Sequence, residues 1–127
     1  MRDYRQLEVW QRAHQITLTV YKATASFPRE EMYGMTSQIR RCSASVGANI
    51  AEGCGRRSNP DFHRFLLIAS GSASELDYHL LLSRDLKFLS NTAYSQISAE
   101  LARLRRQLTS LIVKVGGERQ QPHSNDQ

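Results

Sequence analysis

The sequence lacks any apolar run long enough to cross a bilayer. Its longest runs, at residues 65–69 and 80–82, fall far short of the roughly 20 residues that a membrane-spanning helix needs. We therefore predict that this chain is not an integral membrane protein. Residues 1–15 mix charged with apolar side chains and contain neither an apolar core segment nor a small-residue cleavage site. We expect a cytoplasmic protein.

Cysteine is scarce, with only Cys42 and Cys54 in the chain. If both lie on one helix, their separation of twelve residues places them about 18 Å apart. A disulfide allows only about 7 Å between Cα atoms, so we expect reduced thiols. We interpret both cysteines as small residues in helix packing, with an exposed Cys54 as the alternative.

Sequence signatures of catalysis and cofactor binding are also missing. No Glu-x-x-His pair occurs, although a carboxylate-bound metal pair in a helical bundle uses two of them. The segment "GCGRRSNP", residues 53–60, has neither a preceding strand nor the Gly-Lys-Ser/Thr ending of a phosphate-binding loop. Glu75 and His79 lie four residues apart, a spacing that we interpret as a surface interaction. No glycine-flanked nucleophile turn is present, so we expect no enzymatic activity, no cofactor and no metal.

Helical periodicity is what the sequence does contain. Prolines and glycines divide the chain into four segments, and in each one apolar residues recur at steps of three and four. The last segment carries the strongest pattern, a heptad repeat from Tyr94 to Val115. No segment alternates with period two, so we expect no strand. The predicted helices cover about residues 6–26, 31–53, 60–88 and 92–115.

Four amphipathic helices with short connections predict an all-α protein, an up-and-down antiparallel four-helix bundle over residues 1–116. Residues 117–127 are expected to form a flexible polar tail. The second and third helices are rich in Gly, Ala and Ser at residues 43–51 and 69–74. We expect these two faces to approach closely, either within one bundle or against a second subunit.

Several short motifs between residues 7 and 76 carry a resemblance to a known family. They are "VW" at 9–10, "FP" at 27–28, "YG" at 33–34, "SQIRR" at 37–41, "NIAEG" at 49–53 and "FLLIASGSASEL" at 65–76. The segment closely resembles bacterial four-helix-bundle proteins encoded by open reading frames in intervening sequences of 23S ribosomal RNA genes. Accessory variability proteins of diversity-generating retroelements are related bundles.

This resemblance implies a protein that assembles into oligomers rather than one that catalyses a reaction. Members of the family look like non-enzymatic subunits of rings, typically cyclic homopentamers. The retroelement relatives are basic barrels that associate with nucleic acid and with a reverse transcriptase. We therefore expect a homo-oligomer, in the form of a cyclic pentamer.

A positive net charge is the remaining global signal. The chain has 17 Lys and Arg against 12 Asp and Glu, a net charge of +5, and arginine predominates. Arginines around the second and third helices and on the fourth could bind phosphates of RNA or DNA, or acidic residues of a neighbouring subunit. A solvated surface is the simpler alternative. The candidates are Arg40, Arg41, Arg56, Arg57, Arg64, Arg105 and Arg106, of which we expect the first five to cluster.

Three polar residues of the second helix are candidates for an interface or structural role: Gln38, Asn49 and Glu52. Asn49 and Glu52 share one helix face. They either bond backbone groups and the loop near the helix end, or contact another subunit. Gly53 is expected to end the helix in a left-handed turn.

Two hypotheses for function follow. The first is a ring-forming basic scaffold that contacts structured nucleic acid with little sequence specificity, and it predicts binding that weakens steeply with salt. The alternative is a protein–protein assembly module that binds a protein partner and no nucleic acid.

Overall fold

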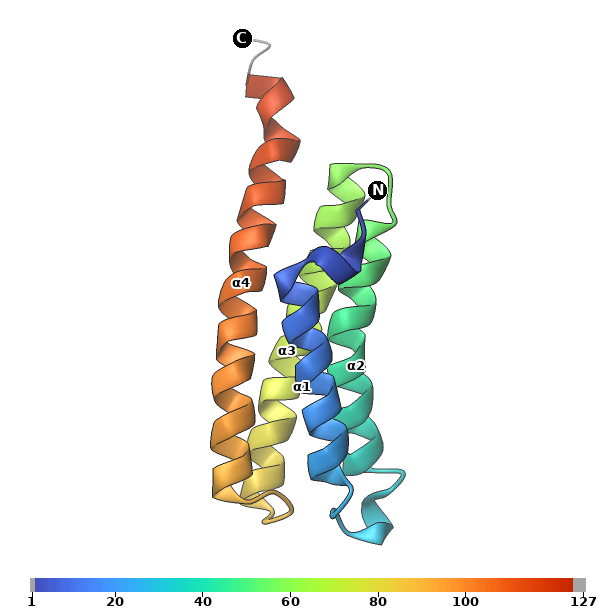
Figure 1. Cartoon of the computed structure of the whole chain (residues 1–127), viewed down its shortest axis with the longest axis vertical. Helices are drawn as coiled ribbons and strands as arrows, with labels where there is room; N and C mark the ends of the chain where they lie inside the picture. Colours follow the sequence, from blue (N-terminus) through green and yellow to red (C-terminus); the bar gives the residue numbers. More distant parts are fainter. Residues whose placement is uncertain (1, 125–127) are drawn as a thin grey trace.

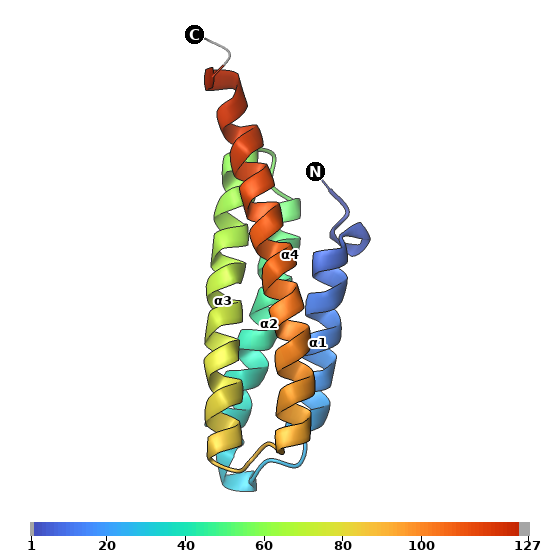
Figure 2. The same cartoon turned by 90° about the vertical axis from the view of Figure 1, so that its left-hand side faces the viewer.

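The computed structural model describes the backbone of residues 2–124 and the side chains of residues 2–117. Four helices run alternately up and down, and no strand occurs within residues 2–124 (Figure 1). Each helix packs against its neighbours in sequence, and α1 also packs against α4, which closes the bundle (Figure 2). The predicted all-α four-helix bundle is confirmed. Its helices are α1 (Glu8–Thr24), α2 (Met35–Cys54), α3 (Asn59–Asp85) and α4 (Asn91–Ser124).

The core is a continuous apolar column to which every helix contributes one stripe. The predicted heptad of α4 is buried at Ile97, Leu101, Leu104 and Leu108. Burial of such a seam removes apolar surface from water and is the main force that holds the bundle together. The other buried apolar residues are Val9, Ala13, Ile16, Val20, Phe27, Ile39, Cys42, Val46, Ile50, Cys54, Phe62, Leu66, Ala69, Ala73, Leu76, Leu80, Leu89 and Val115.

Two short 3-10 turns precede the first two helices. The η1 turn (Tyr4–Gln6) leads into α1, and the η2 turn (Arg29–Glu31) lies between α1 and α2. The second helix therefore begins at Met35, four residues later than the expected 31, because the chain first makes the η2 turn after Pro28.

The end of α3 is a Schellman motif that contains no glycine. The N–H groups of Lys87 and Phe88 donate to the carbonyls of Arg84 and Ser83, both at 2.9 Å. This motif requires a left-handed residue after the helix, and Lys87 has a φ of 65°. The helix ends at Asp85, before the expected 88, because this turn reverses the chain.

The last helix extends beyond its expected end at 115. It continues to Ser124 through Gly116 and Gly117, neither of which has a positive φ. Glycine disfavours a helix by only about 1 kcal/mol relative to alanine, so two glycines need not end one. The predicted polar tail at 117–127 is thus helical as far as Ser124, and residues 125–127 lie outside the described residues.

Gly53 lies inside α2 rather than in a left-handed turn. A Cβ at this position would lie 2.9 Å from Cδ1 of Phe62 and 3.0 Å from Cβ of Phe65. Glycine is needed here because α3 approaches the α2 backbone closely, and the helix ends one residue later, at Cys54. The predicted close packing of α2 and α3 is therefore real at Gly53. Gly71 on α3, by contrast, is exposed and would place a Cβ in open space.

Residues 2–7 cross the end of the bundle at the α2–α3 connection. The Arg2 N–H donates to the carbonyl of Cys54 at 3.0 Å. The Arg2 guanidinium lies 4.4 Å from the centroid of the Phe62 ring and donates to the Asn59 side chain at 3.2 Å. The start of the chain is thus tied to the same end of the bundle as the start of α3.

Within the part of the chain that the structure describes, no helix is long and apolar enough to span a membrane.

Candidate functional site

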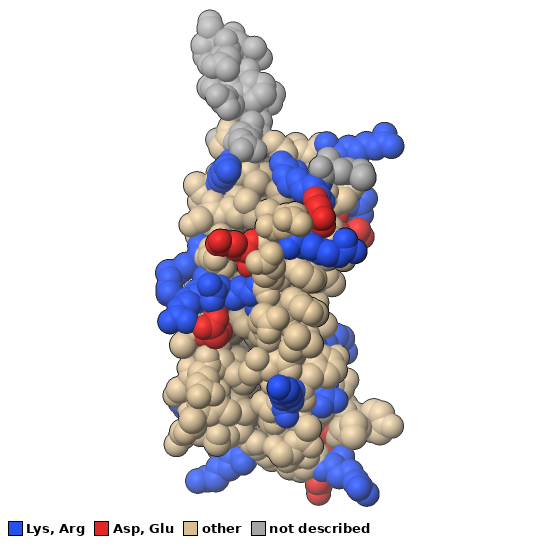
Figure 3. All heavy atoms as spheres, in the orientation of Figure 1, with Lys and Arg blue, Asp and Glu red and all other residues tan. Residues whose placement is uncertain are grey.

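The seven candidate arginines occupy three separate regions of the bundle. Arg40 and Arg41 lie near the start of α2, whereas Arg56 and Arg57 follow its other end. The part of α2 from Arg40 to its end at Cys54 alone rises about 21 Å along the axis, so the expected cluster of five does not form. Basic side chains on the face shown in Figure 3 are correspondingly spread along the whole bundle, several of them beside acidic ones.

Arg40 is held by the end of α1. Its Nε donates to Oγ1 of Thr24 at 2.8 Å, and its Nη2 donates to the carbonyl of Tyr21 at 3.2 Å. The guanidinium also lies 4.7 Å from the centroid of the Tyr21 ring. The Tyr21 carbonyl, in the last turn of α1, also accepts from the Thr24 hydroxyl at 3.2 Å, so Arg40 adds a partner from α2 to this helix end. Arg40 therefore joins α1 to α2, whether or not it also binds a phosphate.

Arg56 and Arg64 converge on one aromatic ring at the α2–α3 end. Their guanidinium groups lie 4.8 and 4.5 Å from the centroid of Phe65. Arg56 also pairs with Glu52 at 3.5 Å, and Arg64 with Asp61 at 3.9 Å. Exposed pairs of this kind contribute little to stability, but they neutralise part of the local positive charge.

Arg105 connects α4 to α3. Its Nη1 lies 3.4 Å from a carboxylate oxygen of Asp77, and its Nη2 donates to the hydroxyl of Ser74 at 3.0 Å. Its side chain remains 43% exposed. A phosphate would therefore have to compete with Asp77 for this guanidinium.

Three candidates are exposed and have no carboxylate within 4.0 Å among the side chains of residues 2–117. They are Arg41, Arg57 and Arg106. Arg41 donates to Oε1 of Gln38 at 3.0 Å, a neutral partner that leaves its charge uncompensated. We name these three residues the unpaired arginines.

The predicted polar residues of α2 bond within the chain. Nδ2 of Asn49 donates to the backbone carbonyl and the hydroxyl of Ser45, at 2.8 and 3.0 Å. The Ser45 hydroxyl in turn lies 2.9 Å from that of Ser72 on α3, which makes a polar seam between the two helices. Glu52 pairs with Arg56 and Gln38 with Arg41. This geometry favours the structural alternative, and the role of these residues at an interface stays a prediction.

Both thiols are buried and poorly nucleophilic. Burial, followed by the negative charge of Glu75, raises the pKa of Cys42 to about 11. Its sulfur lies 3.7 Å from Nδ1 of His79. Burial also raises the pKa of Cys54, which is fully buried. Because the thiolate is the reactive form, these cysteines act in packing, and the alternative of an exposed Cys54 is wrong.

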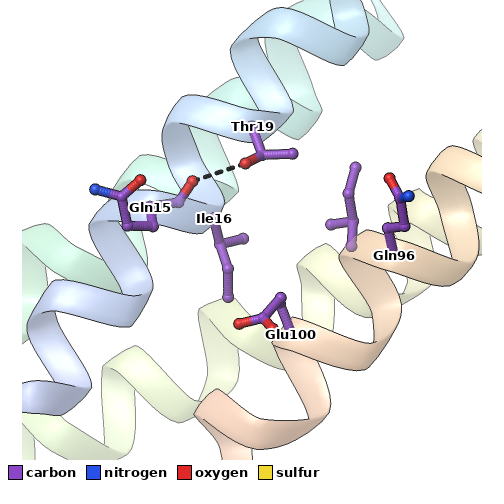
Figure 4. Close-up of a pocket in the computed structure, with 6 residues that line it drawn as sticks. Gln15, Ile16, Thr19, Gln96 and Glu100 are labelled. Atoms are coloured by element: carbon purple, nitrogen blue, oxygen red, sulfur yellow. Dashed lines mark hydrogen bonds between the residues drawn. The ribbon is translucent and has the colours of Figure 1, made fainter.

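A shallow pocket of about 270 Å³ lies between α1 and α4 (Figure 4). Gln15, Gln96 and Glu100 surround the apolar side chain of Ile16 there. The Glu100 carboxylate accepts from Arg12 and from Arg103, both at 2.6 Å. Its charge is therefore already matched by two guanidinium groups, and the pocket offers amides and a neutralised acid rather than a nucleophile with a base.

Two further hollows lie along the seam between α1 and α2, and sequence reasoning missed both. One, of about 270 Å³, has small residues of α2 as its floor and Tyr4, Trp10 and His14 as its wall. Trp10 stacks on His14 with ring centroids 4.9 Å apart and an interplanar angle of 8°. The buried stripe of α1 runs through Val9 and Ile16, and Trp10 is partly buried and packs against the edge of the core.

The other hollow, of about 510 Å³, lies where α1 passes into α2. It contains Tyr21 and Tyr33 together with Arg40 and Arg41. The signal for it in the sequence was the "YG" motif beside "SQIRR", which places an aromatic residue a short distance before two arginines.

Comparison with known proteins identifies relatives of this fold. The chain is similar to a crystal structure from Bacteroides thetaiotaomicron VPI-5482, described as a protein with unknown function from the S23 ribosomal protein family. The two are 27% identical, with a TM-score of 0.74 over 82% of this chain and 97% of that one. No curated protein matches the chain. Residues 5–110 match the family described as 23S rRNA-intervening sequence protein, and the chain therefore belongs to that family.

Proposed function

We propose that this protein is a non-enzymatic, cytoplasmic scaffold that assembles into a ring and contacts structured nucleic acid through its arginines. The observation that carries the proposal is the set of unpaired arginines, Arg41, Arg57 and Arg106, whose charge no described side chain compensates. Guanidinium groups bind phosphate oxygens in a bidentate manner and carry no sequence information when they do so. Binding with little sequence specificity follows.

Assembly is supported by apolar side chains on the surface of the single chain. Leu18 on α1 and Leu67 on α3 are about half exposed, and Tyr78 is 58% exposed. Large apolar side chains exposed on a single chain are candidates for the surfaces that neighbouring subunits cover. A ring of five chains at +5 each would carry about +25, and its repeated arginines would act together on one extended polyanion.

The test is fluorescence anisotropy of a labelled structured RNA and of a duplex DNA, each titrated with the protein at several salt concentrations. If the unpaired arginines each neutralise one phosphate, log K should fall against log salt with a slope of about −2.7 for each bound chain. Substitution of all three by glutamine should weaken binding to both nucleic acids and reduce the slope by about the same amount.

The matched control replaces Lys22, Lys87 and Lys114 by glutamine, which removes the same charge from other exposed positions. A smaller loss in this variant shows that position matters as well as net charge. Equal losses in the two triple variants, or no binding of the native protein at physiological salt, would refute nucleic-acid contact through these arginines.

Light scattering tests the ring itself. One chain has a mass of 14.5 kDa, so a pentamer should appear near 73 kDa.

The alternative function is an assembly module that binds protein partners only. It is favoured by the arginines that already have acidic partners in the chain, Arg56, Arg64 and Arg105. It predicts the same ring with no salt-sensitive binding of RNA or DNA.

A further inference from the structure

The hollow of about 510 Å³ at the α1–α2 end of the bundle is lined by two tyrosine rings and two arginine side chains. Tyr33 is 97% exposed, which leaves both faces of its ring without a partner in the described chain. Tyr21 and Met32 beside it are each nearly half exposed. This volume lies in the range of roughly 300–1,000 Å³ that is typical of small-ligand sites. We name this hollow the Tyr33 pocket.

Arg40 gives the Tyr33 pocket a rigid, flat wall. Its guanidinium is fixed by hydrogen bonds to Thr24 and to the Tyr21 carbonyl and lies 4.7 Å from the centroid of the Tyr21 ring. A guanidinium plane is a surface on which nucleobases stack, as are aromatic rings. Because the bonds to α1 already hold the plane in place, a stacking ligand would lose little further freedom on binding.

Arg41 supplies a cation whose charge is uncompensated. It uses one of its five N–H donors on Gln38 and retains the others. Two acidic residues lie on the adjacent η2 turn, Glu30 and Glu31. The Glu31 carboxylate accepts the backbone N–H of Met35 at 3.1 Å, so it is directed at the start of α2, while Glu30 is exposed.

We propose that the Tyr33 pocket binds an unpaired nucleotide, with its base stacked on Tyr33 and on the Arg40 guanidinium and its phosphate bound by Arg41. This proposal rests on the proposed nucleic-acid function and adds single-stranded segments as the preferred target. Proteins bind single-stranded nucleic acid in grooves that combine aromatic rings with basic side chains, because every unpaired base has a face that can stack on a ring. Bases within a duplex have their faces covered by their neighbours, so they cannot use this pocket.

The test compares a fluorescein-labelled, unstructured 15-nucleotide pyrimidine strand with a duplex of the same length. Tyr33→Ala should weaken binding of the single strand at least fivefold, since one stacked base contributes that much or more. Binding of the duplex should change less than twofold. Tyr33→Phe keeps the ring and should bind the single strand as the native protein does.

Val113→Ala is the control, because Val113 is an apolar residue on α4 that is 68% exposed and lies outside the pocket. It should leave binding of the single strand unchanged. Arg41→Gln should weaken binding of both probes and lower the salt dependence. At 97% exposure, Tyr33 can be replaced without loss of core packing, and circular dichroism of each variant checks that the helices are retained.

The outcomes separate this proposal from the proposed function. Salt-sensitive binding of both probes that Tyr33→Ala does not change would overturn the pocket and leave the scaffold function standing. No binding of either probe would overturn both. A Tyr33→Ala protein whose mass by light scattering falls to that of a single chain would show that a second copy occupies the pocket, which also overturns the proposal.

Discussion

One substitution, glycine to alanine, should have opposite effects at two positions of this bundle. Gly53 on α2 faces α3, and an added Cβ would lie 2.9 Å from a ring carbon of Phe62 and 3.0 Å from Cβ of Phe65. Phe62 is 1% exposed, so its ring cannot move aside without disturbing the core. Gly71 lies within α3, is exposed, and has no atom within 4 Å of where a Cβ would be placed.

The magnitudes follow from these distances. Alanine is favoured over glycine inside a helix by about 1 kcal/mol, and at Gly71 nothing opposes that gain. At Gly53 the same gain is opposed by overpacking, which costs about 1–3 kcal/mol in a tightly packed core. Gly71→Ala should therefore stabilise the protein by about 1 kcal/mol, and Gly53→Ala should destabilise it by roughly 1 kcal/mol.

Thermal unfolding followed by circular dichroism measures this difference. For a chain of this size, 1 kcal/mol shifts Tm by roughly 3–5 °C, so the two variants should differ by about 6–10 °C. A Gly53→Ala protein as stable as Gly71→Ala would refute the close approach of α3 to Gly53. If Gly71→Ala lowers Tm and also lowers the mass in light scattering, the outer face of α3 is covered by another subunit, and the reasoning from open space is wrong.

Three further predictions concern a helix end, an interhelical ion pair and the buried thiols. Lys87→Gly should raise the free energy of unfolding by about 1 kcal/mol in urea titrations, because glycine adopts the left-handed conformation of the Schellman motif without the strain that lysine has; an unchanged midpoint would contradict that strain. A double-mutant cycle of Arg12→Gln and Glu100→Gln should give a coupling of about 0.5–1.5 kcal/mol, since these residues join α1 to α4 at 2.6 Å, and zero coupling would contradict their role. Folding raises the pKa of Cys42 from 9.0 to about 11, so the protonated thiol contributes stability that is complete below pH 9 and is lost as the pH rises through about 11. The free energy of unfolding should therefore fall between pH 9 and 11, and it should fall more steeply than in Cys42→Ala. Both thiols should react with Ellman's reagent at pH 8 only after denaturation, and fast reaction of the folded protein would contradict their burial.

The architecture was predictable because helical periodicity persists through the whole chain. Burial of the α4 heptad at Ile97, Leu101, Leu104 and Leu108 needed no tertiary information. In α1 residues of the same period divide between the core and its edge, because Val9 and Ile16 are buried whereas Trp10 is only partly buried. Periodicity does not separate the two sets, but ring N–H groups are costly to bury without a partner, and Trp10 and His14 line the hollow beside α2 instead.

Helix ends were harder to predict because local signals were misleading. Lys87 occupies a position where glycine is the usual residue, so the sequence contains no signal for the end of α3. Gly116 and Gly117 are such a signal, yet the helix continues through them. Gly53 was interpreted as a helix end and is instead a contact with α3. The same residue type serves conformation in one place and packing in another, and only the neighbouring helix distinguishes them.

The partners that arginines find on other helices could not be predicted from the sequence. Arg105 contacts Asp77 on another helix, and Arg40 contacts the end of α1, because the antiparallel arrangement brings distant residues together. Charge counts show that the chain is basic, but they do not show which guanidinium groups lack a partner. The unpaired arginines emerge only once the helices are placed beside one another.

The attachment of Arg2 to Cys54 has a practical consequence for handling the protein. Arg2 and the end of α4 both lie at the end of the bundle where α2 meets α3, opposite the Tyr33 pocket (Figure 1). A protein immobilised through a label at this end of the bundle would present Tyr33 to the solution and hold Arg57 close to the support. The same nucleic acid tested on tethered and on free protein would therefore report separately on the two ends of the molecule.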